Sequence, residues 1–399
     1  MTVGQDNKSA VEVILDELRA LKEAGLYRRP MVIEDARGPY VTIGGERYLS
    51  FCSNDYLGLA DHPQIKKAVG EAVNRYGWGA RASRLVSGTG VLHQRLEAGL
   101  ARFKSTEDAL VYPTGYMANI GAICALMGRG DLIIGDRLNH ASIIDASRQS
   151  GADLRVYAHK DAGALDRVLK RVSNDFGKIL VVTDGVFSVD GDIAPVPEIV
   201  SVARKHGPHI MTMVDDAHGT GVFGNGGRGV LEHLGVREGV DIQMGTLSKA
   251  LGGIGGFVAG TRELIDFLKN RSRSFMFTTA IPPAACAAGL EALKLVEGDE
   301  GVERRERLWR NCRHLEEGLR AIGFDVTVQS PIVPVILGEP KRAVGASNAL
   351  YNNNKLLVPP IRPPTVPQGT SRLRISLSSD HTTEHLDSLL EGLKMVERQ

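Results

Sequence analysis

The chain has 399 residues of ordinary globular composition, enough for a large hydrophobic core and one or two domains. Its 48 basic and 47 acidic residues leave a formal net charge of +1, which argues against nucleic acid or another polyanion as a partner. Four scattered cysteines, no signal-peptide pattern and no apolar run of membrane-spanning length predict a cytoplasmic protein without disulfides or a membrane partner.

The first predicted elements are a helix and a hairpin. Apolar residues recur at helical spacing over about 9–24, and Gly25 is expected to end that helix. Residues 40–43 and 48–51 have strand character on either side of Gly44-Gly45, which predicts a β-hairpin. We therefore expect residues 1–50 to form an N-terminal helix and hairpin arm.

Strands and helices alternate through the middle of the chain. The clearest strands are 109–112, 132–134, 179–182 and 210–214, and helical periodicity separates them. This order predicts a mainly parallel sheet covered by helices, with a ligand beyond the carboxyl ends of the strands. We assign residues 51–285 to this large α/β domain.

The last part of the chain mixes helices and strands. A long helical stretch is expected from about 285 towards Trp309, and strands follow at 326–328, 333–336 and 373–377. A terminal helix is expected from Thr383. The pattern predicts a smaller α+β C-terminal domain over residues 286–399.

One lysine, Lys249, follows a short apolar run and stands beside Thr246 and Ser248 and before Gly252-Gly253. A lysine amine is nucleophilic only when deprotonated, so a catalytic lysine needs a partly desolvated pocket. The hydroxyls suit an anion, and the glycines allow a bulky ligand to come close. These features suit a Schiff-base lysine that holds pyridoxal 5'-phosphate (PLP), but a surface lysine in a loop would also satisfy them.

Polar groups after the predicted strands strengthen this interpretation. Thr114-Gly115-Tyr116 resembles a helix start, whose free N–H groups can hold a phosphate. His140 follows the strand 132–134 and could stack on an aromatic ring. Asp184 and Ser188 follow the strand 179–182.

The carboxylates after the strand 210–214 have two interpretations. Asp215 could keep a pyridine nitrogen protonated, with Ala217 against the ring and His218 donating to its phenolate oxygen. Asp215 and Asp216 could instead hold a metal, but no further carboxylate stands at ligand spacing. We therefore expect no metal.

Together these motifs resemble the α-oxoamine synthases, which condense an amino acid with an acyl-CoA. The matching segments are 51–59, 139–142, 183–188, 215–221 and 245–249, so the similarity spans nearly the whole chain. It implies an α/β protein with the PLP-dependent transferase fold of type I: a mainly parallel, seven-stranded type of sheet flanked by helices, with a smaller α+β C-terminal domain. It also implies a homodimer with a shared active site, and amino-acid and acyl-CoA or acyl-carrier-protein substrates.

The resemblance implies catalytic roles for four residues. Lys249 would form the Schiff base with PLP and then move the Cα proton of the substrate. Asp215 would pair with the pyridine nitrogen, and His218 with the phenolate oxygen. His140 would stack over the ring opposite Ala217 and stand near the thioester carbonyl as a candidate acid.

Further cofactor contacts follow from the same resemblance. Gly115, Tyr116 and Thr246 would hold the phosphate, and Thr278 or Thr279 would reach the phosphate of the neighbouring subunit. Ser188 would contact the ring. Asp184 would support it at a position where some members carry glutamate.

On the substrate side the resemblance implies Asn54 and Arg374. A planar guanidinium can bind an α-carboxylate bidentately, which suits Arg374 as the clamp for the amino acid. We expect Arg372, two residues earlier on the same strand, to face the other way.

The segment 361–367 is similar to the 8-amino-7-oxononanoate synthases of biotin synthesis, which join L-alanine to pimeloyl-CoA or its carrier-protein thioester. Arg362 and Thr365 would then contact substrate, and Arg28 or Arg29 would face the distal carboxylate of the acyl chain. The segment 246–253 is also like glycine C-acetyltransferases and serine palmitoyltransferases, so glycine with acetyl-CoA is the alternative pair. The rivals of other classes are a non-catalytic subunit, expected to have lost Lys249, and a nucleotide-dependent oxidoreductase, whose fingerprint is absent.

Overall fold

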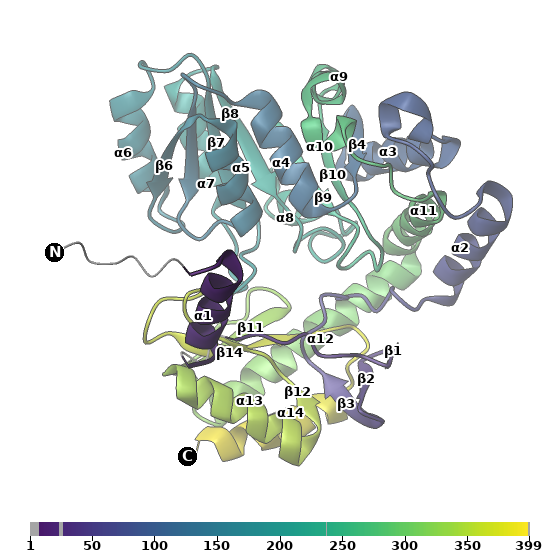
Figure 1. Cartoon of the computed structure of the whole chain (residues 1–399), viewed down its shortest axis with the longest axis vertical. Coiled ribbons are helices and arrows are strands. Elements are labelled where there is room, and N and C mark those ends of the chain that lie inside the picture. The colour runs from purple at the N-terminus through teal and green to yellow at the C-terminus, as the bar shows by residue number, and fades with distance from the viewer. Residues whose placement is uncertain (1–7, 24–26, 237, 398–399) are drawn as a thin grey trace.

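The N-terminal arm is a helix followed by a small sheet, in a computed structural model that describes residues 8–23, 27–236 and 238–397. Helix α1 (Ala10–Glu23) confirms the predicted helix, whereas Gly25 lies outside the described residues. Strands β1 (Asp35–Arg37), β2 (Tyr40–Ile43) and β3 (Glu46–Ser50) are antiparallel, which confirms the hairpin. Strand β12 (Leu356–Leu357) pairs in parallel with β3 and ties the arm to the C-terminal part of the chain (Figure 1).

A seven-stranded sheet forms the centre of the middle region. Its order is β4 (Asp108–Tyr112), β10 (Gly256–Gly260), β9 (Ile242–Thr246), β8 (Ile210–Asp215), β7 (Ile179–Asp184), β5 (Leu132–Asp136) and β6 (Asp153–Tyr157). Only β10 runs antiparallel to its neighbours, so the predicted mainly parallel sheet is confirmed. Every residue of β5 and β7 is buried, as expected for parallel strands with both faces covered.

Helices cover this sheet on both sides (Figure 1). They are α3 (Val91–Lys104), α4 (Gly115–Leu126), α5 (Ala141–Ser150), α6 (Ala162–Val172), α7 (Val196–His206), α8 (Val230–His233), α9 (Arg262–Arg271) and α10 (Arg273–Met276). Helix α2 (Pro63–Tyr76) and the π-helical turn η1 (Arg84–Gly88) precede them. The parallel strands end at one edge, where Asp184 stands opposite Asp215, and Asp215 opposite Met244.

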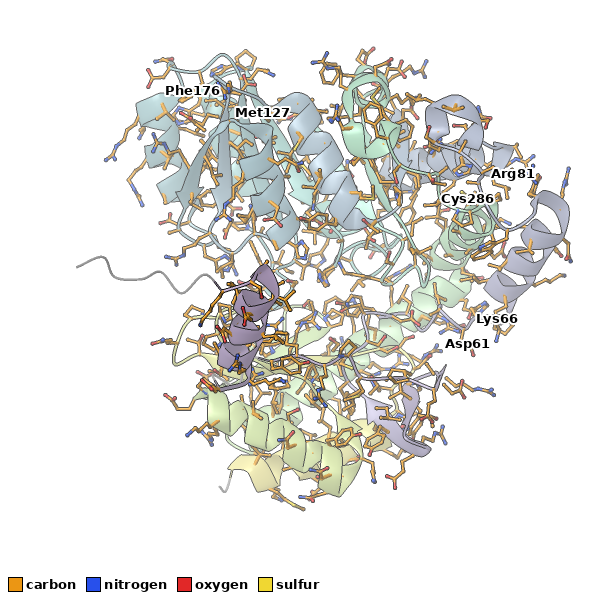
Figure 2. The ribbon with its side chains drawn as sticks, viewed as in Figure 1. Asp61, Lys66, Arg81, Met127, Phe176 and Cys286 are labelled. Atoms are coloured by element: carbon orange, nitrogen blue, oxygen red, sulfur yellow. The ribbon has the colours of Figure 1, made fainter. Side chains whose placement is uncertain are left out.

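The predicted long helical stretch from about 285 is two helices, α11 (Pro283–Glu297) and α12 (Asp299–Ala321). The break falls at Gly298, whose extended backbone (φ −85°, ψ 178°) ends α11 and caps α12. Apolar periodicity continues across the break, which is why the pattern alone did not reveal it. Figure 2 shows Cys286 on α11, where its side chain is buried.

The C-terminal part contains an antiparallel sheet of β11 (Ile332–Gly338), β14 (Ser371–Ser376) and β13 (Pro360–Ile361) with helices α13 (Pro340–Asn354) and α14 (Thr383–Glu397). The strands expected at 333–336 and 373–377 and the terminal helix are confirmed. The strand expected at 326–328 is wrong, because this segment bonds to side chains of α12 instead of another strand. Arg320 Nε donates to the Val326 carbonyl, and the Val328 amide donates to Glu316.

Across the described ranges, no helix is both long enough and apolar enough to cross a membrane. The division into an arm (1–50), a large domain (51–285) and a C-terminal domain (286–399) stays a prediction.

Candidate active site

A cavity of about 260 Å³ lies at the carboxyl ends of the central strands. Residues that follow β4, β5, β7, β8 and β9 all contribute to its wall. The predicted residues that line it are Asn54, Gly115, Tyr116, His140, Asp184, Ser188, Asp215, His218, Thr246 and Lys249. The topology of the sheet thus brings together side chains that are far apart in the sequence.

Lys249 follows β9 and extends into this cavity. Burial lowers the pKa of its amine, while the nearby carboxylates of Asp215 and Asp184 act in the opposite direction. Within the described residues, Lys249 Nζ has no hydrogen-bond or ion-pair partner. The turn after it requires Gly252, which has φ +62° and would bring a Cβ within 2.5 Å of the Ala60 amide nitrogen. The lysine is therefore held in a desolvated position that favours the nucleophilic neutral amine.

Asp215 ends β8 and is fixed by two hydrogen bonds. Its Oδ2 accepts from Asn119 Nδ2 at 2.7 Å, and its Oδ1 accepts from the Ala217 amide at 3.0 Å. Asn119 Nδ2 also donates to Ser142 Oγ at 2.8 Å, whereas the buried Asn119 Oδ1 has no partner among the described residues. The sequence reasoning gave Asn119 no role. Its position four residues after Gly115, on the same face of α4, is the signal that could have identified it.

His218 lies against a tyrosine that the sequence reasoning also left without a role. Its Nδ1 lies 2.7 Å from the hydroxyl of Tyr56, which is fully buried. Burial raises the pKa of Tyr56 to about 12 and lowers the pKa of His218 well below its usual value. The hydroxyl of a tyrosine that stays protonated can donate to Nδ1, which is nearer than its other acceptor, Asn54 Oδ1 at 3.3 Å. The ring proton of the neutral histidine then sits on Nε2.

His140 caps helix α5 at the cavity wall. Its amide donates to Asp184 Oδ2 at 2.8 Å, and its Nδ1 lies 2.7 Å from Ser142 Oγ. Burial raises the pKa of Asp184 well above its usual value, and the neighbouring Asp215 raises it further. Desolvation lowers the pKa of His140, which favours a neutral ring.

The start of helix α4, in the same cavity wall, is suited to an anion. Helix α4 begins at Gly115, and the Thr114 side chain accepts from the Met117 amide, so the amides of Gly115 and Tyr116 have no partner within the helix. Gly256 lets β10 pack closely against the start of this helix, because a Cβ there would lie 2.6 Å from the Gly115 Cα. Thr246 lies beside them, with its Oγ1 donating to the Gly255 carbonyl at 2.7 Å.

Arg374 is half-buried next to the cavity and contacts two of its lining residues. Its Nε donates to the Ser188 carbonyl at 2.6 Å, and its Nη2 donates to Asn54 Oδ1 at 3.4 Å. The expectation that Arg372 faces the other way was wrong, because residues two apart on a strand share a face. Arg372 pairs with Asp190, in the same loop after β7 that carries Ser188.

Five predicted residues lie away from the cavity wall of the single chain. Arg28, Thr279 and Thr365 are exposed, whereas Thr278 and Arg362 are half-buried. Thr279 forms an isolated β-bridge with Ser83, and the Thr365 amide donates to the Arg362 carbonyl. Their roles stay predictions.

Asp216, the second carboxylate of the metal alternative, faces away from the cavity and binds a buried lysine. Lys104 Nζ lies 2.8 Å from Asp216 Oδ2, and both side chains are almost fully buried. In the part of the chain that the structure describes, no group of histidine, cysteine and acidic side chains could hold a metal ion.

The cavity fits a flat, phosphorylated aldehyde such as PLP. Lys249 supplies a desolvated amine, Asp215 a fixed carboxylate, and the start of α4 an anion site. Gly115 has no side chain, so backbone at the start of α4 is exposed in the cavity wall beside Thr246.

Comparison with known proteins gives a consistent set of relatives. Residues 46–393 match the family model for aminotransferase class I and II. The 8-amino-7-oxononanoate synthase of Thermoanaerobacter pseudethanolicus is 44% identical over 98% of this chain and 98% of its own. That of Geobacter sulfurreducens is 47% identical over 97% of this chain and 98% of its own.

Solved structures agree with this fold. The serine palmitoyltransferase of S. paucimobilis with a bound PLP–myriocin aldimine is 35% identical, with a TM-score of 0.91 and coverage of 99% of both chains. The 8-amino-7-oxononanoate synthase of Francisella tularensis is 29% identical, with a TM-score of 0.77 and coverage of 88% of this chain and 98% of its own.

Proposed function

We propose, since the chain belongs to the aminotransferase class I and II family, that it acts within that family as a PLP-dependent α-oxoamine synthase. The reaction is the decarboxylative condensation of L-alanine with a pimeloyl thioester to 8-amino-7-oxononanoate in biotin biosynthesis. The observation that carries the proposal is the desolvated, unpartnered amine of Lys249 in a cavity with the fixed carboxylate of Asp215.

The cofactor is PLP, which supplies an electron sink for the carbanion at the substrate Cα. Asp215 would keep a proton on the pyridine nitrogen, and the Nε2–H of His218 would face the phenolate oxygen. The amides of Gly115 and Tyr116 would hold the phosphate together with Thr246. Each of these groups already occupies a fixed position in the chain, so binding costs little reorganisation.

Lys249 and Arg374 would act on different groups of the amino-acid substrate. Arg374 would bind the α-carboxylate and so orient the Cα–H bond. Lys249, whose pKa burial lowers, would accept the Cα proton as a base and later return it. A C–C bond forms between Cα and the thioester carbonyl carbon, the thiol departs, and the α-carboxylate leaves as CO2. His140, which lines the same cavity, would act as the acid near the thioester carbonyl.

Substrate choice is tested with paired substrates. Purified enzyme receives L-alanine with pimeloyl-CoA, glycine with acetyl-CoA, or L-serine with palmitoyl-CoA, and CoA release is measured. We expect the first pair to give the highest kcat/KM, because the relatives at 44% and 47% identity are 8-amino-7-oxononanoate synthases, whereas the serine palmitoyltransferase is 35% identical. Preference for either other pair would reject this specificity.

The chemistry has its own test, independent of the acyl donor. The purified protein should be yellow, and borohydride should abolish its visible absorbance. The Lys249→Ala variant should lack that absorbance and turn over no substrate. A colourless wild-type protein that gains no absorbance after addition of PLP would contradict the cofactor assignment.

We extend the proposal to a homodimer with shared active sites. Large apolar side chains are exposed near the Ser83–Thr279 bridge: Leu85 is 54% exposed, Val86 81% and Phe277 69%. Such a concentration of apolar surface is typical of a subunit interface. In this arrangement Thr278 or Thr279 would reach the phosphate of the neighbouring subunit.

Hybrid dimers test the shared site. Lys249→Ala subunits should be inactive and Thr279→Ala subunits weakly active, and mixing them after mild dissociation should raise the activity above that of either variant. Only a hybrid has one site with an intact lysine and an intact threonine from the other subunit. No recovery, despite hybrid formation in a native gel, would place Thr279 outside the partner's site.

We also propose a cytoplasmic location, which the state of the four cysteines supports. All four are unpaired, as is usual in a reducing compartment.

A further inference from the structure

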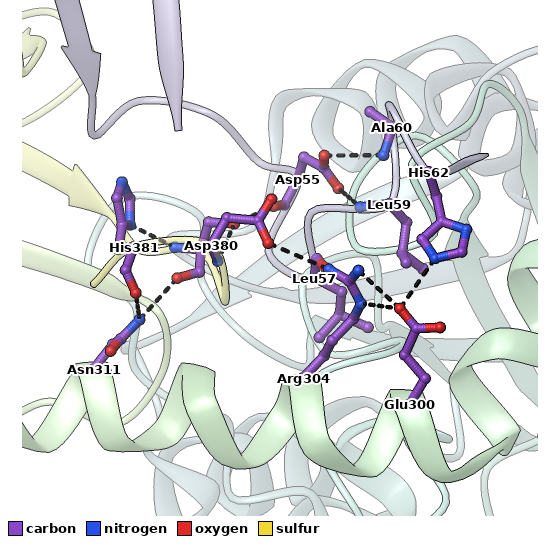
Figure 3. Close-up of polar contacts among 11 residues, drawn as sticks. Asp55, Leu57, Leu59, Ala60, His62, Glu300, Arg304, Asn311, Asp380 and His381 are labelled. Carbon is purple, nitrogen blue, oxygen red and sulfur yellow. Dashed lines mark hydrogen bonds and ion pairs between the residues drawn. The ribbon is translucent and has the colours of Figure 1, made fainter. Parts of the chain in front are cut away.

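Arg304 on α12 connects three separate segments of the chain (Figure 3). Its Nη1 donates to the Leu57 carbonyl at 2.8 Å and lies 3.2 Å from Asp380 Oδ1. Its Nε donates to Glu300 Oε1 at 2.9 Å, one turn earlier on the same helix. The guanidinium side chain is only 14% exposed, so solvent screens these contacts weakly.

The segment that receives Arg304 is a tight turn over residues 55–60. The carboxylate of Asp55 accepts from the amides of Leu59 at 2.9 Å and Ala60 at 3.0 Å, which closes the turn. Gly58 has φ +64°, and a Cβ at this position would overlap the carboxylate of Asp380. The turn is therefore shaped so that Asp380 can pack directly on its backbone.

Arg304 also supplies positive charge to both carboxylates of this site, and Arg307 adds to it at Asp380. Burial raises the pKa of both Asp55 and Asp380, and the guanidinium of Arg304 lowers both. Without this cation, two half-desolvated carboxylates would face each other across the turn.

The turn begins inside the active site. Asn54 lines the cavity and accepts from Arg374, and the Tyr56 hydroxyl lies 2.7 Å from His218. A backbone contact also binds Tyr56 to the segment before α14: the Ser379 amide donates to the Tyr56 carbonyl at 2.8 Å. A shift of the turn would therefore move the partners of both His218 and Arg374.

We infer that Arg304 is a positioning residue for the amino-acid site: it holds the 55–60 turn so that Asn54 and Tyr56 meet Arg374 and His218. This inference rests on the proposed function, in which Arg374 binds the substrate carboxylate. Arg304 itself touches neither cofactor nor substrate and acts through the backbone of Leu57.

The test compares two neighbouring arginines of the same helix. Arg304→Met keeps the length of the side chain and removes its donors. Arg305→Met is the matched control, because Arg305 is even more deeply buried and donates to the carbonyls of Val296 and Asn225, neither of which lines the cavity. The PLP-loaded enzyme is titrated with L-alanine, and the change in visible absorbance gives the Kd. Thermal unfolding is measured on the same samples.

We expect Arg304→Met to raise the Kd for L-alanine about tenfold, as the loss of one well-placed hydrogen bond would. Arg305→Met should lower the unfolding temperature with an unchanged Kd. Asp380→Asn, a milder change that keeps the shape of the side chain, should raise the Kd in the same direction by a smaller factor. If Arg304→Met does not fold, Asp380→Asn decides alone.

The inference is overturned if folded Arg304→Met has an unchanged Kd for L-alanine. If Arg304→Met does not fold, an unchanged Kd in Asp380→Asn overturns it. Equal Kd increases in Arg304→Met and Arg305→Met also overturn it, because the effect would then follow stability. A wild-type enzyme whose absorbance does not respond to L-alanine contradicts the proposed function itself and, with it, this inference.

Discussion

Replacing Asn119 with alanine should separate cofactor binding from folding stability. The change removes the Asn119 Nδ2 donor from Asp215 Oδ2, at 2.7 Å, and leaves that carboxylate with the Ala217 amide as its remaining fixed donor. Hydrogen bonds to a charged group contribute about 1.5–3 kcal/mol. The same substitution removes the buried, unpartnered Asn119 Oδ1, which relieves a cost of roughly 1–3 kcal/mol.

These two effects nearly cancel in the free energy of unfolding of the cofactor-free protein. They do not cancel in PLP affinity, because only the donor to Asp215 bears on the carboxylate that faces the pyridine nitrogen. We therefore expect the Kd for PLP to rise roughly tenfold to a hundredfold, at about 1.4 kcal/mol for each tenfold.

The assay has two parts: urea unfolding of the cofactor-free protein and equilibrium titration with PLP, followed by visible absorbance. Ser142→Ala removes the other acceptor of the same Asn119 nitrogen without touching Asp215. Because Ser142 Oγ also lies 2.7 Å from His140 Nδ1, its effect on PLP affinity measures the part that does not pass through Asp215. A large loss of stability in Asn119→Ala with unchanged PLP affinity would refute the reasoning, because Asn119 would then support the fold and not Asp215.

Three further predictions follow from the geometry. Arg374→Lys should raise the KM for L-alanine at least tenfold in steady-state kinetics, because an ammonium cannot keep the planar, two-point contact with the carboxylate. An unchanged KM would show that Arg374 does not bind the substrate carboxylate. His381 is buried with its pKa lowered to about 4, so the unfolded state binds more protons than the folded state between about pH 6.5 and pH 4. Stability should therefore fall as the pH falls through this window, and His381→Gln should flatten the slope in urea unfolding; an equal slope in both proteins would contradict the assignment. Gly252→Ala should lower the unfolding temperature and the fraction of Lys249 bound to PLP, because a Cβ at this position would clash with the backbone of Ala60. If the unfolding temperature and the PLP-bound fraction both stay at their wild-type values, the turn can accommodate a Cβ.

The sheet could be predicted from the sequence because its strands are buried on both faces. Such strands are continuous apolar runs, and β7 is buried from Ile179 to Asp184. The segment 326–328 has the same composition but bonds to the side chains of Arg320 and Glu316, which no local pattern encodes. Composition alone therefore identifies a strand only where a neighbouring strand is available.

Many of the residues that line the cavity could also be predicted from the sequence. Asp184, Asp215 and Lys249 each follow a strand, and parallel strands end at one edge, so their convergence follows from topology. Asn119 and Tyr56 were missed because their roles depend on contacts across 96 and 162 residues of chain. The partners in such pairings are set by tertiary packing; the helical spacing from Gly115 places Asn119 on the cavity face of α4 but does not identify Asp215 as its partner.

The parallel pairing of β12 with β3 has a consequence for how the enzyme is made. The amides of Leu49 and Phe51 donate to the carbonyls of Lys355 and Leu357, and the Ser376 amide donates to the Phe51 carbonyl. The strand β3, which leads into Asn54, pairs early with β2 but finds its second partner, β12, only after more than three hundred further residues have been synthesised. During translation the central sheet can fold first, whereas the part of the active site that binds the amino-acid substrate is completed only when the C-terminal segments have been made. A nascent chain would therefore acquire its cofactor pocket before it acquires a complete substrate site, and catalysis would begin only with the finished polypeptide.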